Sequence, residues 1–139
     1  VDENRALATA GAAARDLGVV AVDLAGREAA FPDPLVFRDF SPGDDLVKGP
    51  YGLSEPAEDR AARDPDIVFS PLSAFDRRGY RLGYGGGIYD ATLSELRAKK
   101  SIVAVGVAYS FQEVDHVPTE PHDQRLDYFL TERERIEIV

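Results

Sequence analysis

Cysteine, methionine and tryptophan are all absent from the 139-residue sequence, and histidine occurs only twice. Without cysteine there can be neither a disulfide framework nor a thiolate metal site, and two histidines argue against a zinc site. No apolar run approaches the roughly 18 residues of a membrane span. No charged-then-apolar signal peptide opens the chain. These absences favour a cytoplasmic location and argue against membrane insertion.

Basic residues are too few to balance the acidic ones, and the net charge is −9. Nonspecific binding to nucleic acid or to an anionic membrane needs a basic surface, so both are excluded as expected partners. The hydrophobic share of 44% and the charged share of 29% predict one globular domain with a real core. The chain begins with Val1 and has no methionine, which suggests that it is incomplete.

Helical patterns alternate with continuous apolar runs along the chain. A helix is predicted over residues 2–17 and another from residue 88 or 89 to about residue 100, where basic residues suit the helix dipole. Strands are predicted at 19–24, 35–37, 66–72 (the central strand), 102–108, 126–130 and 136–139. Residues 49–56 and 76–87 are predicted to be loops. This order predicts an α/β fold, a three-layer Rossmann-like single domain whose mostly parallel sheet has helices on both faces.

Four glycines fall within five positions at residues 83–87, between the predicted central strand and the second helix. A strand, a glycine loop and a helix N-terminus in that order form an anion-binding arrangement. The loop lacks the P-loop lysine, and Ile88 stands where the dinucleotide fingerprint needs its third glycine. Phosphate binding therefore competes with a tight structural turn, and the local basic residues Arg77, Arg78 and Arg81 favour phosphate.

Carboxylates occur at two positions that the fold should bring to one edge of the sheet. Asp90 lies in the first turn of the second helix, where it either complements the helix dipole or binds magnesium beside a phosphate. Residues 118–123 form a proline-bounded loop carrying Glu120, His122 and Asp123, which suit a hard metal or acid–base chemistry, or simply a solvated turn. His116 is expected on the surface and Glu55 in an exposed turn, with substrate contact as the alternative for Glu55.

The sequence FDRRGYRLGYGGGIYD at residues 75–90 resembles the signature of the 5-formyltetrahydrofolate cyclo-ligase family, also called 5,10-methenyltetrahydrofolate synthetases. Further matches follow the family in order and spacing. They are GLSEP at 52–56, PDIV at 65–68, GVA at 106–108, Gln112, VP at 117–118, HD at 122–123, LD at 126–127 and TE at 131–132. This ordered set covers nearly the whole chain and is highly specific.

The resemblance implies an enzyme whose partners are ATP, as co-substrate, and 5-formyltetrahydrofolate, with Mg²⁺ as cofactor; a monomer is expected. The implied products are 5,10-methenyltetrahydrofolate, ADP and phosphate. Arg81 would be the catalytic residue, and Asp90 and Asp123 would hold the metal. The implied ATP-binding residues are Arg81, Leu82, Gly83, Tyr84, Gly85, Gly86, Gly87, Ile88 and Tyr89. The implied folate-binding residues are Tyr84, Gly85, Gly86, Gly87 and Ile88.

Three departures from the family leave alternatives open. Ile88 replaces a frequent tyrosine and Ala91 a frequent arginine. The family's N-terminal helical segment, which contributes to both sites, has no match here, so an N-terminally incomplete domain is expected. A catalytically silent nucleotide- or folate-binding paralogue or fragment is the alternative function. An unrelated α/β enzyme that handles sugar phosphates or coenzyme A is the third hypothesis.

Overall fold

The computed structural model describes residues 19–23, 34–49, 54–83 and 87–139, with the backbone alone for 19–23. The predicted helix at 2–17 lies outside these residues. The chain divides into two compact units, one formed by Val1–Glu28 and Leu35–Asp64, the other by Ala29–Pro34 and Pro65–Val139. Single-domain organisation stays a prediction. Among the described residues, no helix has the length and apolar character that a membrane crossing requires.

In the part of the first unit that the structure describes, the strands form two antiparallel pairs. Strand β1 (Val19–Asp23) pairs with β2 (Val36–Phe40), and β3 (Leu46–Lys48) pairs with β4 (Ser54–Pro56). The predicted loop at 49–56 is therefore wrong at its end, which is a strand. Glu55 in β4 is 2% exposed rather than lying in an exposed turn. Its carboxylate packs against Gly49, where an added Cβ would lie 2.2 Å from Glu55 Cδ, so glycine makes room for it.

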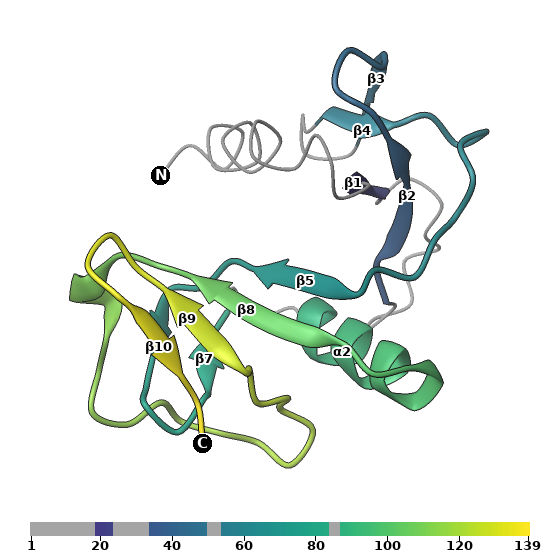
Figure 1. Ribbon diagram of the computed structural model, residues 1–139. Coiled ribbons are helices and arrows are strands. Elements are labelled where there is room, and N and C mark those ends of the chain that lie inside the picture. The colour runs from purple at the N-terminus through teal and green to yellow at the C-terminus, as the bar shows by residue number, and fades with distance from the viewer. Residues whose placement is uncertain (1–18, 24–33, 50–53, 84–86) are drawn as a thin grey trace. The chain divides into compact units, whose positions relative to one another are not determined.

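The second unit is built on a four-stranded sheet in the order β10-β9-β8-β5 (Figure 1). Its strands are β5 (Ile67–Ser70), β8 (Val103–Val107), β9 (Tyr128–Leu130) and β10 (Arg135–Glu137). The β5–β8 and β8–β9 pairings are parallel, and β10 joins β9 antiparallel. Strand β5, predicted to be central, lies at one edge of this sheet. Continuous apolar runs thus formed the parallel strands of an α/β fold, as expected.

Helix α2 (Ile88–Lys99) connects β5 and its following hairpin with β8. Gly87 precedes it with φ of 63°, a left-handed conformation that costs glycine little. The helix buries Leu93 and Leu96, and basic residues in its last turn complement the dipole. Both its start and its buried face agree with the sequence prediction.

A short hairpin and a stacked aromatic pair occupy the region that was predicted to be loop. Strands β6 (Ala74–Phe75) and β7 (Arg81–Leu82) pair antiparallel, so the loop prediction for 76–87 missed β7. Phe75 stacks on Phe129 with ring centroids 4.5 Å apart, and both are fully buried. Gly106 of β8 permits this packing, because an added Cβ would lie 2.4 Å from the Phe129 ring. After β8, the 3-10 helix η2 (Ser110–Gln112) begins the long connection to β9.

Candidate functional site

A cavity of about 610 Å³ lies in the second unit, at the N-terminal end of α2. Four separate segments line it: the end of β5, the β7 strand, the start of α2 and the loop at 118–123. Its lining residues are Pro71, Arg81, Leu82, Gly83, Gly87, Ile88, Tyr89, Asp90, Pro118, Thr119, Glu120, His122 and Asp123. The cavity therefore brings the flanks of the glycine loop and Asp123 together, as the sequence predicted.

Arg81 places a buried cation at this cavity. Its side chain is only 6% exposed, and its Nη1 donates a hydrogen bond to the Pro71 carbonyl at 3.2 Å. The guanidinium lies over the Tyr89 ring, 5.2 Å from the centroid, in a cation–π contact. Burial lowers the pKa of Arg81, while the negative charges of Asp90 and Asp123 act in the opposite direction. Arginine stays protonated near neutral pH despite such a shift, so the cavity keeps a positive charge.

The first turn of α2 supplies the carboxylate nearest to this guanidinium. Asp90 Oδ2 lies 4.0 Å from Arg81 Nη2, and the Asp90 side chain is 16% exposed. Its other oxygen, Oδ1, accepts a hydrogen bond from the backbone amide of Gln124 at 2.9 Å. Gly83 leaves space for the guanidinium, since an added Cβ would lie 2.8 Å from Arg81 Nη1. A positive group and a carboxylate thus face one another at the helix N-terminus.

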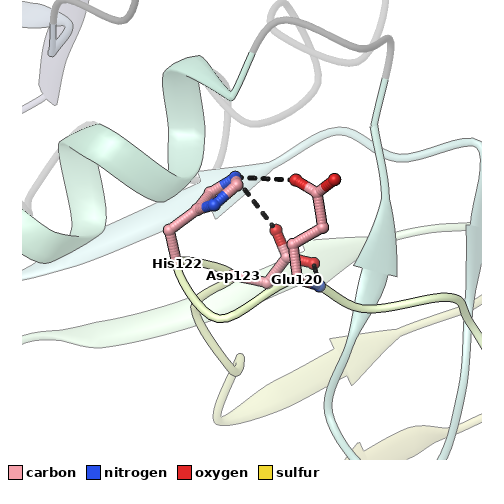
Figure 2. Close-up of side chains that lie close together, drawn as sticks. All are labelled: Glu120, His122 and Asp123. Atoms are coloured by element: carbon pink, nitrogen blue, oxygen red, sulfur yellow. Dashed lines mark hydrogen bonds and ion pairs between the residues drawn. The ribbon is translucent and has the colours of Figure 1, made fainter.

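Three potential metal ligands gather in the loop at 118–123 (Figure 2). His122 Nε2 lies 3.2 Å from Glu120 and 3.7 Å from Asp123 Oδ1. One ligand atom from each of the three residues lies within 4.8 Å of the others. Asp123 Oδ2 accepts the Glu120 backbone amide at 2.8 Å, which closes the turn. Asp123 is 21% exposed, whereas Glu120 and His122 are largely exposed, so Asp123 is the member best placed in the cavity wall.

Two of the three arginines that were expected to provide local positive charge for a phosphate do not line the cavity. Arg77 forms ion pairs with Glu113 and Glu134, both at 2.8 Å. Arg78 pairs with the fully buried Asp76, also at 2.8 Å. Arg77 and Arg78 therefore do not bring the expected positive charge to the cavity, because carboxylates from distant segments engage Arg77 and the buried Asp76 engages Arg78.

Of the remaining predicted site residues, some belong to the part of the chain that the structure describes and others do not. Tyr84, Gly85 and Gly86 lie outside the described residues, so their expected contacts with ATP and folate stay predictions. Leu82, Gly83, Gly87, Ile88 and Tyr89 all line the cavity. His116 is exposed, as expected. Sequence reasoning missed the lining residues Pro71, Pro118 and Thr119, although Pro71 directly follows β5 and Pro118 begins the loop at 118–123.

Comparison with known proteins identifies relatives over most of the chain. The model of the 5-formyltetrahydrofolate cyclo-ligase family matches residues 19–132. A 5-formyltetrahydrofolate cyclo-ligase of Haemophilus influenzae is 40% identical over 64% of this chain and 49% of its own length. One from Mycolicibacterium smegmatis is 35% identical over 78% of this chain and 56% of its own length. The chain thus spans about half the length of these curated relatives.

A solved structure shows the same likeness in three dimensions. The 5,10-methenyltetrahydrofolate synthetase of Aquifex aeolicus superposes with a TM-score of 0.73 at 28% identity, covering 99% of this chain and 66% of that protein. Both sequence and fold contradict the hypothesis of an unrelated α/β enzyme and confirm the resemblance read from the signature. The chain belongs to the 5-formyltetrahydrofolate cyclo-ligase family.

Proposed function

We propose that the chain carries the site of an ATP- and Mg²⁺-dependent enzyme that converts 5-formyltetrahydrofolate to 5,10-methenyltetrahydrofolate. One observation carries the proposal: the buried guanidinium of Arg81 and the carboxylates of Asp90 and Asp123 come from three segments and line one cavity. Phosphoryl transfer needs a fixed cation for the moving phosphate and oxygen ligands for a metal. Both kinds of group are present in this cavity.

Arg81 is suited to hold the phosphate chain of ATP. Its Nε is buried and has no hydrogen-bond partner among the residues that the structure describes, which leaves a donor for a ligand oxygen. An unpartnered buried donor is costly, and a phosphate oxygen would satisfy it. The amides of the first α2 turn, beginning at Ile88, would add further donors at the positive end of the helix dipole.

Asp90 and Asp123 fit Mg²⁺ by chemistry, because both offer carboxylate oxygens and Mg²⁺ prefers one or two carboxylates together with phosphate oxygens and water. When bound, the ion would neutralise charge on the phosphates. Asp90 Oδ1 is engaged by the Gln124 amide, so Oδ2 is the oxygen turned toward Arg81 and available for this role.

The proposed reaction has two stages. The formyl oxygen of the folate attacks the γ-phosphorus of ATP, and the bond to ADP breaks, which leaves a phosphorylated imidate on N5. N10 then attacks the formyl carbon, the C–O bond breaks, phosphate departs, and the N10 proton passes to solvent. Arg81 would stabilise the negative charge of the transferring phosphoryl group and then of the departing phosphate. The loop residues Gly83 and Gly87 would let backbone approach both ligands closely.

A catalytically silent nucleotide- or folate-binding protein is the second candidate. The observation that favours it is coverage, since the matched relatives are about twice as long as their match to this chain. Binding without turnover would be expected if residues outside this chain complete the pocket.

We also propose that the complete fold has the three-layer arrangement with a mostly parallel sheet. On one sheet face, Ile67, Phe69, Val103 and Val107 are between 38% and 51% exposed. Sheets rich in parallel strands normally have both faces covered, so a further layer is expected over these side chains. The cytoplasmic location and the monomeric state stay predictions.

The experiment combines a binding assay with a turnover assay. Thermal melting with ATP, with and without Mg²⁺, should show stabilisation that requires the metal. Adding 5-formyltetrahydrofolate, ATP and Mg²⁺ should then produce the methenyl chromophore. Stabilisation without the chromophore would favour the silent binding protein, and no stabilisation in either condition would contradict the nucleotide site.

A further inference from the structure

We propose that Asp76 and Arg78 are positioning residues: their side chains hold the first end of the Asp123-bearing loop, and the turn that they form holds its second end, next to the strand that carries Arg81. The consequence for activity rests on the proposed function, whereas the positioning itself concerns the protein alone. Neither residue lines the cavity. They act through the loop at 117–126.

The turn at 76–79 is internally bonded and directly precedes β7. The Asp76 amide donates to the Tyr80 carbonyl at 3.0 Å, and the Gly79 amide donates to the Asp76 carbonyl at 3.1 Å. Asp76 Oδ1 accepts the Arg78 amide at 2.9 Å, and Gly79 has φ of 96°, which favours glycine. These bonds give the turn a defined conformation, and it ends two residues before Arg81.

The first end of the loop is held at Val117 by both side chains. The Val117 amide donates to Asp76 Oδ2 at 2.8 Å, and Arg78 Nη2 donates to the Val117 carbonyl at 2.8 Å. The two side chains also bind each other, with Arg78 Nε and Nη2 donating to Asp76 Oδ2 at 3.1 and 2.8 Å. Asp76 is fully buried, so the Val117–Asp76 bond is shielded from water, whereas the Arg78 side chain is 40% exposed.

The second end of the loop is held by the backbone of the same turn. The Leu126 amide donates to the Gly79 carbonyl at 2.8 Å, and Arg125 Nε donates to the Arg78 carbonyl at 2.8 Å. An added Cβ at Gly79 would lie 3.0 Å from the Leu126 carbonyl oxygen, so glycine permits this approach. Both ends of the 117–126 loop thus meet one four-residue turn.

Between these fixed ends lie the residues that face the cavity. The Asp123 side chain is turned inward by the Glu120 amide, and the neighbouring Gln124 amide binds Asp90. Arg78 is three residues before Arg81, and its side chain bonds Val117 at the start of the loop. It therefore connects the strand that carries the Arg81 guanidinium to the loop that carries the Asp123 carboxylate. Loss of the Arg78 side chain would leave Asp76 buried and charged, with the Val117 carbonyl short of one donor.

The test compares Arg78→Ala with the matched control Arg77→Ala. Arg77 is adjacent, also pairs with carboxylates, and its bonds reach Glu113 and Glu134 rather than the ends of the loop. In amide hydrogen exchange without ligand, we expect Arg78→Ala to speed exchange of the 117–126 segment about tenfold, and Arg77→Ala to leave it near wild type. Arg78→Lys, which keeps the charge but not the fork of donors, should give an intermediate rate.

A second measurement separates positioning from general stability. The Mg²⁺ concentration for half-maximal ATP-dependent turnover should rise several-fold in Arg78→Ala, with most of the activity recovered at saturating Mg²⁺. Unchanged exchange at 117–126, or equal effects of the two alanine variants, would overturn the proposal. If Arg78→Ala does not fold, Arg78→Lys is measured in the same way, and wild-type exchange at the loop would contradict the proposal. Absence of nucleotide binding by the wild type would count against the proposed function alone, because the exchange result does not depend on it.

Discussion

The carboxylate of Asp90 accepts a hydrogen bond from the backbone amide of Gln124, with Oδ1 and N 2.9 Å apart. This bond joins the first turn of α2 to the loop that carries Asp123. The sequence left two roles open for Asp90, complementing the helix dipole and binding a metal. The structure adds a third, because one oxygen fastens the loop while the other lies 4.0 Å from Arg81.

Replacing Asp90 by asparagine should separate these roles. The side-chain carbonyl oxygen of the introduced asparagine can still accept a hydrogen bond from the Gln124 amide. The melting temperature should therefore fall by only a few degrees, because losing the helix-dipole and ion-pair interactions lowers the free energy of unfolding by about 1 kcal/mol. The Mg²⁺ requirement should shift by tenfold or more, because a neutral ligand replaces a carboxylate. Thermal melting against Mg²⁺ concentration with ATP present measures both. Glu95→Gln, on the exposed face of α2, is the control, and an equal shift in that variant would contradict the assignment.

Asp123→Asn should reduce metal-dependent turnover far more than it reduces stability. The side chain accepts the Glu120 amide through Oδ2, and asparagine can keep an acceptor there, so the turn should persist. We expect turnover to fall at least about 100-fold and the free energy of unfolding to fall by about 1 kcal/mol or less. Urea denaturation measures the free energy of unfolding, and the chromophore assay measures turnover. Asp115→Asn is the matched control, since Asp115 is exposed on the same connection and does not line the cavity. Proportionate losses of stability and turnover at Asp123 would indicate a structural role instead.

Long regular elements could be predicted from the sequence because local pattern determines them. The apolar runs around β5 and β8 and the helical spacing of Leu93 and Leu96 need no knowledge of the rest of the chain. The hairpin strands β4 and β7 could not be predicted in this way. They span three and two residues, and only pairing with β3 and β6 makes them strands.

The candidate site shows the same division between local and distant information. Arg81 and Asp90 are close in sequence, and the rule that ligands gather beyond the carboxyl ends of parallel strands placed Asp123 near them. The partners of Arg77 could not be foreseen, because Glu113 and Glu134 lie 36 and 57 residues away. The burial of Glu55 was missed for a related reason, since it depends on a strand pairing and on the space left by Gly49.

Arg81→Lys should lose catalysis while keeping the positive charge. Lysine has no planar fork, so it cannot both bond the Pro71 carbonyl and offer the geometry of the buried Nε to a phosphate. We expect turnover to fall by about 10²–10³-fold, comparable to the loss of one fixed donor to a transition state. ATP affinity from thermal shift should fall less than turnover. Arg133→Lys, on an exposed turn, is the control. Wild-type turnover in Arg81→Lys would remove Arg81 from the catalytic role.

Because of Asp76, part of the protein's folding stability should be lost as the pH falls into the acid range. Burial raises the pKa of its carboxyl, but hydrogen bonds from the Val117 amide, the Arg78 side chain and the Arg78 and Tyr80 amides outweigh burial and hold the pKa below its ordinary value of 3.8. A depressed folded-state pKa stabilises the protein above the unfolded pKa, and this stability is lost as pH falls through the folded value. Urea midpoints should therefore decline from about pH 4 downward. Asp76→Asn should lower the free energy of unfolding by about 2 kcal/mol at pH 7, a value that allows for the partial exposure of Arg78. The difference between variant and wild type should shrink as the pH falls below about 4, and a difference that stays constant from neutral pH into that acid range would show that the Asp76 charge is not what stabilises the turn.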